Sequence, residues 1–157
     1  MQARILELAP VNIACLRYVG PMGLEVGQFW QRTVQPWLQE NGLENVARYG
    51  IGHDDPDLTP PDRCRYDACA EVPANFLAAS NVHLTTLPGG WYAAIDFRGK
   101  AEEMGAAWTA LFSQWLPGSG FSLDAARPCF EHYAPNAFHD RKSGEFACDL
   151  CLPVLPK

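Results

Sequence analysis

The sequence predicts an α+β fold, a pseudo-twofold tandem repeat of βαββ units with antiparallel sheets, two long helices and a ligand cleft between the repeats. Two stretches of the chain resemble one another at a constant offset, and each contains an amphipathic helix beside apolar strands. Both halves also end in an Asp-x-Cys pattern before a proline. A hydrophobic content of 48% and a charged content of 19% agree with a folded domain.

The repeat is clearest around the helices. The stretches that begin at Pro10 and Pro88 each start with an apolar strand, which ends at a glycine before the helix. Residues seven apart lie on one face of a helix, so paired aromatics at that spacing should pack against a sheet. Each helix carries two tryptophans at this spacing and at the same offset between the halves: Trp30 and Trp37, then Trp108 and Trp115.

The expected elements follow in the same order in each half. The first half should contain strands near 4–8 and 12–19, a helix near 24–40, and strands near 45–53 and 64–72. The second half should contain strands near 82–87 and 90–98, a helix near 101–116, and strands near 127–134 and 145–152. Pro36 should kink the first helix or loosen one of its turns, because proline removes a backbone donor and crowds the preceding carbonyl. We expect a single domain over 1–157, made of repeats 1–80 and 81–157.

Charge and hydropathy restrict the partners. The 18 acidic residues outnumber the 12 basic ones, which gives a net charge of -6. Proteins that bind nucleic acid directly need the opposite balance, so we expect no direct nucleic-acid binding. The sequence lacks the ~20-residue apolar run of a membrane helix and the pattern of a signal peptide, so we expect no membrane partner and a cytoplasmic location.

Neither the cysteines nor the acidic loop predicts a metal site. In the cytoplasm the six cysteines should stay reduced, and free cysteine is among the most buried residue types. The segment from His53 to Arg63 holds four aspartates and three prolines. Its oxygens suit a divalent cation, but a solvated loop with Asx turns explains the same composition. We expect the loop, with no metal and no cofactor.

One carboxylate stands inside a predicted strand near the C-terminal end of the chain. Strand residues alternate between faces, so Glu131 shares a face with Cys129 and Tyr133, and Phe130 and His132 point the other way. A carboxylate among rings loses hydration and needs a partner or a proton. A flat, lipophilic cation would supply a counter-charge and ring stacking. A glutamate that faces solvent on a half-exposed sheet is the alternative.

Four stretches together resemble a known bacterial family: "RYGIGHDDPDLTPPDRCRYDACAEV", "GGWYAAIDFRG", "FEHY" and "FACDLCLPV". The chain resembles the gyrase-inhibitor-like (GyrI-like) small-molecule-binding domain over nearly its whole length. This SHS2-type domain also serves as the effector-binding domain of AraC-type and MerR-type multidrug-responsive regulators. Such regulators carry a DNA-binding segment before the domain, and this chain begins at the first predicted strand, so we expect a stand-alone member.

The resemblance also implies a set of site residues. In the family, a glutamate on the strand that matches "FEHY" commonly lies at the floor of the cleft and pairs with cationic aromatic ligands, which points to Glu131. Trp91 and Tyr92 are neighbours on a strand, so only one of them faces the cleft. The expected ligand-binding set is Glu131, Tyr49, Tyr66, Trp91, Tyr92, Tyr133 and Trp108.

Three functions follow, and the first is preferred. The protein would sense or sequester amphipathic, cationic aromatic compounds without catalysis. A second hypothesis, from the resemblance and the net charge, makes it an inhibitory partner of DNA gyrase. A third makes it a hydrolase of reactive electrophilic natural products, with Glu131 as general acid or base and Tyr133 or Tyr49 as hydrogen-bond donor.

Overall fold

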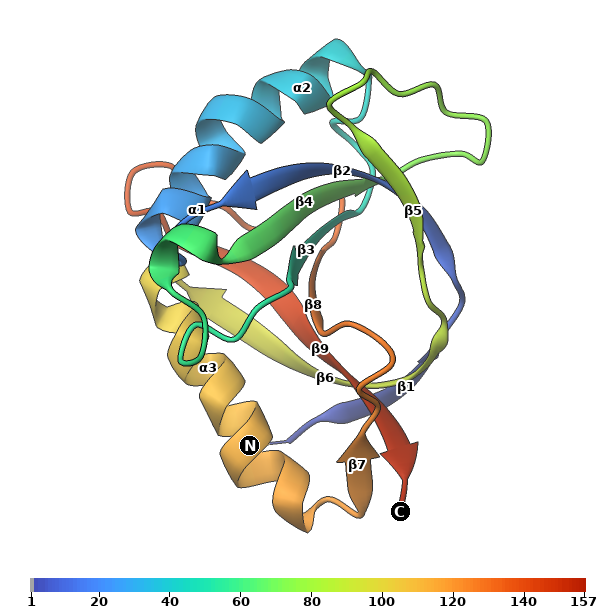
Figure 1. The fold of residues 1–157 in the computed structure, drawn as a ribbon, viewed down its shortest axis with the longest axis vertical. Coiled ribbons are helices and arrows are strands. Elements are labelled where there is room, and N and C mark those ends of the chain that lie inside the picture. The colour runs from blue at the N-terminus through green and yellow to red at the C-terminus, as the bar shows by residue number, and fades with distance from the viewer. Residues whose placement is uncertain (1) are drawn as a thin grey trace.

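A curled antiparallel sheet organises the chain in the computed structural model, which describes residues 2–157 (Figure 1). Eight strands follow one another in the order β1-β6-β9-β8-β3-β4-β2-β5, and β7 pairs with the far end of β9. The strands are β1 (Arg4–Leu8), β2 (Val11–Val19), β3 (Arg48–Gly52), β4 (Arg65–Glu71), β5 (His83–Leu87), β6 (Gly90–Gly99), β7 (Phe121–Leu123), β8 (Phe130–Tyr133) and β9 (Phe146–Pro156). The predicted α+β class and antiparallel pairing are confirmed.

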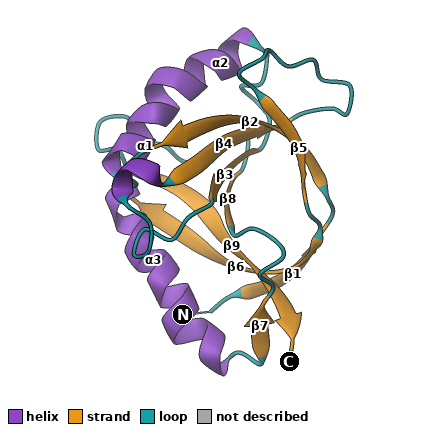
Figure 2. Cartoon of the chain, viewed as in Figure 1, coloured by secondary structure: helices purple, strands orange, loops and turns teal. Residues whose placement is uncertain are grey.

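Two long helices lie along the same side of the sheet (Figure 2). The first runs through α1 (Leu24–Phe29), a π-helical turn (Trp30–Val34) and α2 (Gln35–Glu40). The π-helical turn ends at Val34, two residues before Pro36, whose missing N–H leaves an earlier carbonyl without its usual donor. The predicted loosening of one turn is therefore confirmed.

The second helix has a similar succession of turns. It runs through a 3-10 turn (Ala101–Glu103), α3 (Met104–Ala110), a π-helical turn (Leu111–Trp115) and a 3-10 turn (Leu116–Gly118). The two helices meet near their first turns, where a Cβ on Gly27 would lie 3.8 Å from the Cβ of Ala101. They diverge from this point, one over each part of the sheet (Figure 1).

The two halves exchange their first strands. β1 belongs to the first half of the sequence but pairs with β6, and β5 belongs to the second half but pairs with β2. The halves also meet at the centre of the sheet, where β3 pairs with β8. The boundary between residues 80 and 81 remains a prediction. With that boundary, the first strand of each half pairs with a strand of the other half.

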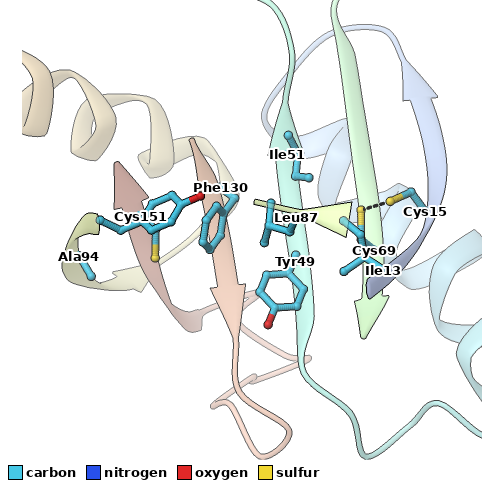
Figure 3. Close-up of a cluster of buried hydrophobic side chains, with 10 residues drawn as sticks. Ile13, Cys15, Tyr49, Ile51, Cys69, Leu87, Ala94, Phe130 and Cys151 are labelled. Carbon is cyan, nitrogen blue, oxygen red and sulfur yellow. Dashed lines mark hydrogen bonds between the residues drawn. The ribbon is translucent and has the colours of Figure 1, made fainter. Parts of the chain in front are cut away.

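Three groups of buried side chains make up the core. The first lines the inner face of the curled sheet and includes Tyr92 as well as Tyr49 and Phe130, which are labelled in Figure 3. The second packs beneath the first helix and includes Val34, and the third packs beneath the second helix and includes Leu111. Five of the six free cysteines are buried, and Cys129 is partly exposed. The prediction of core cysteines holds for those five.

Three strands differ in their boundaries from the predictions. β8 begins at Phe130 rather than near residue 127, because Pro128 has no N–H for a ladder bond. β9 runs on to Pro156, past the predicted end at 152, and its last residues pair with β7, a strand that was not predicted. β3 begins at Arg48 rather than near 45, because turns after the first helix occupy the preceding residues.

The acidic segment between β3 and β4 is a loop. The Asp54 carboxylate accepts hydrogen bonds from the Arg65 side chain at 2.9 and 3.0 Å, and this contact lowers its pKa to about 2. Residues 2–157 contain no group of three or more side chains that could hold a metal ion. Within the same residues, neither helix combines the length and the apolar character that crossing a lipid bilayer requires.

Candidate functional site

Glu131 lies near the centre of the sheet, on the side that carries the helices. In the strand register it stands opposite Gly50 of β3 and Leu150 of β9. Its neighbours on this face come from both helix-covered core groups, since Tyr66 packs beneath the first helix and Tyr133 beneath the second. Glu131 therefore occupies the seam between the two halves.

Two tyrosine hydroxyls hold one oxygen of the carboxylate. The Tyr66 hydroxyl donates to Glu131 Oε1 at 2.7 Å, and the Tyr133 hydroxyl donates to the same oxygen at 2.8 Å. Trp30 covers the pair from the first helix, because its Nε1 donates to the Tyr66 hydroxyl at 3.0 Å. The rings of Trp30 and Tyr133 are 5.5 Å apart between centroids. The carboxylate is thus fixed within a group of rings.

The charge of Glu131 has no basic partner. No Lys, Arg or His within residues 2–157 forms a salt bridge with it. Burial raises the pKa of Glu131, and the two tyrosine hydrogen bonds oppose that rise only in part. Burial, followed by the nearby carboxylate, also raises the pKa of both Tyr66 and Tyr133, so these hydroxyls stay protonated donors.

Gly50 makes room for this arrangement. A Cβ on Gly50 would overlap the Tyr66 hydroxyl and Glu131 Oε1. The neighbouring Gly52 has no such role, since a Cβ there would meet nothing within 4 Å. Only a residue without a side chain at position 50 lets Tyr66 reach across β3 to the carboxylate.

The structure brings together three of the predicted site residues: Glu131, Tyr66 and Tyr133. It places Tyr49 and Tyr92 on the opposite face of the sheet, where both are buried in the inner core against Phe130. Figure 3 shows Tyr49 beside Phe130. The cause is strand alternation, because Tyr49 stands opposite His132, which points away from Glu131. The site proposed below therefore leaves out Tyr49 and Tyr92.

The two predicted tryptophans lie farther from the carboxylate. Trp91 is 44% exposed, near the start of β6. Glu131 stands opposite Leu150 of β9, which in turn stands opposite Ile95 of β6. Trp91 is four residues from Ile95 along β6, so its Cα lies roughly 13 Å from that of Ile95. Trp108 packs against Phe112 on the second helix and belongs to the same core group as Tyr133. Within residues 2–157, neither tryptophan forms a hydrogen bond with Glu131.

The sequence analysis missed Trp30 and Gly50 as members of the site. Trp30 was identified only as a packing residue, and its indole N–H supplies a hydrogen bond to Tyr66 as well. Gly50 is one of two glycines in β3, and strand glycines are a known sign of close backbone approach. That signal was present in the sequence, but it does not distinguish Gly50 from Gly52.

A second polar group, on the inner face, serves the structure. Arg17 donates two hydrogen bonds to Asp67, and His53 Nε2 lies 2.6 Å from the same carboxylate. Burial opposes ionisation of Asp67, but the contacts with His53 and Arg17 outweigh it and lower its pKa to about 2. Asp67 is therefore charged and fully partnered, unlike Glu131.

Two hollows in the surface lie away from Glu131. One of about 420 Å³ is lined by residues from the start of β2 and the end of β4, among them Asn12 and Glu71. A second, of about 200 Å³, shares Asn12 with the first. Neither includes Glu131. Both are open to solvent, and neither brings buried polar side chains together, so we favour the Glu131 seam as the site.

The arrangement at Glu131 suits ion pairing and proton exchange. A desolvated carboxylate attracts a cation strongly, and a raised pKa allows a proton to be taken up nearer neutral pH. Tyr133 has the contact that the hydrolase hypothesis requires, and Tyr49 does not.

Comparison with known proteins identifies the family. The family model for the GyrI-like small molecule binding domain matches residues 1–155. The chain belongs to the GyrI-like family. Among the relatives of this GyrI-like protein is a "DNA gyrase inhibitor" from Edwardsiella piscicida, which is 33% identical over 160 residues, covering 98% of each chain.

Solved structures of similar fold also match this GyrI-like chain. The EcmrR C-terminal domain superposes with a TM-score of 0.73 at 15% identity, over 99% of this chain and 98% of that one. SAV2435, solved with bound tetraphenylphosphonium, has a TM-score of 0.66 at 16% identity, over 99% of this chain and 94% of that one. At these identities both likenesses show the fold alone.

The role of Gly50 gives a first prediction. Gly50→Ala should destabilise the GyrI-like fold by about 1–3 kcal/mol, because the added methyl group must displace the Tyr66 hydroxyl or the Glu131 carboxylate. Gly52→Ala on the same strand is the matched control, with an expected change within about 0.5 kcal/mol. Urea denaturation measures both. Equal stabilities would show that Gly50 has no spacing role.

The unpaired carboxylate gives a second prediction. A raised pKa in the folded state means that stability falls as pH rises from the ordinary glutamate value of 4.5 through the raised value. Glu131→Gln removes this cost and keeps an acceptor for the tyrosines. At pH 7 its Tm should exceed that of wild type by about 3 °C, and the gap should close below pH 4.5.

Thermal unfolding from pH 4 to pH 8 measures that gap, with Glu71→Gln as the exposed control. A Glu131→Gln protein that is less stable than wild type at pH 7 would contradict the prediction, because it would mean that the carboxylate stabilises the fold.

Proposed function

We propose that this protein binds amphipathic aromatic cations at the Glu131 seam, for sensing or sequestration and without catalysis. The observation that carries the proposal is a desolvated carboxylate held by two tyrosine hydroxyls, with no basic partner within residues 2–157. A fold has little reason to keep such a charge for its own stability, since burying it unpaired is costly.

A cationic ligand would remove that cost. The charge of the ligand would compensate Glu131 in a region of low dielectric, where attraction is stronger than in water. The rings of Trp30 and Tyr133 are placed to add cation–π contact, at ~0.5–2 kcal/mol for each well-oriented ring. A neutral molecule of the same shape would gain only the apolar contact, so charge should decide selectivity.

Entry of a ligand requires movement of the covering side chains. Trp30 closes the seam from the first helix, and it is the first residue of the π-helical turn. Turns of this kind are less regular than α-helix and occur often at functional sites. We therefore place the adjustable part of the site on the first helix and the fixed part on β4 and β8.

Titration with tetraphenylphosphonium tests the proposal, with tryptophan fluorescence as the readout and Trp30 as the expected reporter. Wild type should bind this cation, and Glu131→Gln should bind it at least about tenfold more weakly, because a charge-assisted contact of 1.5–3 kcal/mol is lost. Triphenylphosphine oxide is the neutral control ligand and should bind weakly to both proteins.

Glu71→Gln is the control variant, because Glu71 lines the 420 Å³ hollow rather than the seam. It should bind the cation as wild type does. Equal affinity in wild type and Glu131→Gln would contradict the proposal. Loss of binding in Glu71→Gln alone would also contradict it and would place the binding site at the hollow.

The relatives favour a second candidate function, inhibition of DNA gyrase. The name "DNA gyrase inhibitor" is carried by relatives that match over nearly the whole chain, at 33% identity in the Edwardsiella piscicida protein. A net charge of -6 is compatible with contact to a basic surface. A gyrase supercoiling assay at low and raised salt tests this candidate, since contact driven by charge weakens as salt rises.

A further inference from the structure

Arg48 places a positive charge on the same face as Glu131. In the register of β3, Arg48 stands opposite Tyr133 of β8, and Gly50 stands opposite Glu131. Residues two apart on a strand share a face, so Arg48 and Glu131 are diagonal neighbours across the β3–β8 pair. Their Cβ atoms should lie about 7–8 Å apart.

The guanidinium of Arg48 is poorly satisfied. Its Nη2 donates to the Ala134 carbonyl at 3.3 Å, a long hydrogen bond. Its Nε is buried and has no hydrogen-bond partner, and it is the only such side-chain nitrogen or oxygen within residues 2–157. No carboxylate of these residues forms a salt bridge with Arg48. Burial also lowers the pKa of this guanidinium.

Two opposite charges therefore stand side by side without meeting. Glu131 is turned toward the hydroxyls of Tyr66 and Tyr133, and Arg48 reaches past Tyr133 to the Ala134 carbonyl. A buried donor without an acceptor destabilises the fold, and more so when it is charged. Tyr133 stands opposite Arg48 in the strand register and donates a hydrogen bond to Glu131, so an aromatic molecule seated over its ring would have one charge on either side.

We propose that Arg48 binds an acidic group of the ligand, so that the ligand class is zwitterionic: an aromatic cation that also carries a carboxylate. This inference rests on the proposed function, because it places the cationic part of the ligand at Glu131. The Nε–H and an Nη–H of a guanidinium form a fork that suits the two oxygens of a carboxylate. Such a ligand would supply the acceptor that Nε lacks.

A matched pair of dyes tests the inference by fluorescence polarisation. Rhodamine 110 carries a cationic ring system and a free carboxylate, and rhodamine 123 is its methyl ester. Wild type should prefer rhodamine 110 by about tenfold or more, the value of one charge-assisted contact. Arg48→Met should bind the two dyes equally, and Arg48→Lys, which keeps the charge without the fork, should retain part of the preference.

Two controls separate this inference from the proposed function. Glu131→Gln should weaken binding of both dyes, since both carry the cation, and Arg98→Met should behave as wild type because Arg98 is an exposed residue paired with Glu145. Suppose that Glu131→Gln weakens binding of both dyes, while wild type and Arg48→Met show the same preference between them. The proposed function then stands, and the inference that Arg48 binds the carboxylate of the ligand is wrong.

Sodium benzoate gives a readout that does not need a bound cation. It should raise the Tm of wild type and leave the Tm of Arg48→Met unchanged, because only wild type offers the free guanidinium. Equal shifts in both proteins, or none in either, would overturn the inference whatever the dyes do. The Tm values without benzoate also show whether Arg48→Met is folded.

Discussion

The hydrogen bonds from Tyr66 and Tyr133 to one oxygen of Glu131 are the constraint on which the site depends. One tyrosine comes from the core beneath the first helix and the other from the core beneath the second. The carboxylate thus links the two halves through a single atom. Its other oxygen, Oε2, has no hydrogen-bond partner within residues 2–157, so it is the acceptor left for an incoming group.

Under the proposed function, this arrangement trades stability for binding. Replacing a buried charge by a neutral isostere often stabilises a protein, and natural sequences commonly keep costly groups where function requires them. Glu131 and Arg48 are two such groups on one face of the sheet, and neither compensates the other. Asp67 shows the contrasting case within the same chain, since Arg17 and His53 satisfy it fully.

Much of the fold could be predicted from the sequence, because long apolar patterns fix helices and strands wherever they occur. The position of Glu131 on a strand, and the faces of Tyr133 and His132, follow from alternation alone. The side of the sheet on which Tyr49 lies does not, since it depends on how β3 pairs with β8. The role of Trp30 in the site could not be predicted for a similar reason. Its hydrogen bond to Tyr66 joins a helix to a strand far away in the sequence, and no local sequence pattern indicates such a contact.

The exchange of β1 and β5 between the halves limits how the molecule can move. Each half is anchored to the other by a strand at the outer part of the sheet as well as by β3 and β8 at its centre. A hinge motion that separates the halves would break the backbone hydrogen bonds of several strand pairs. Under the proposed function, ligands of different size would instead be accommodated by rotamer changes and small helix shifts above a rigid sheet, which favours broad recognition over a single ligand shape.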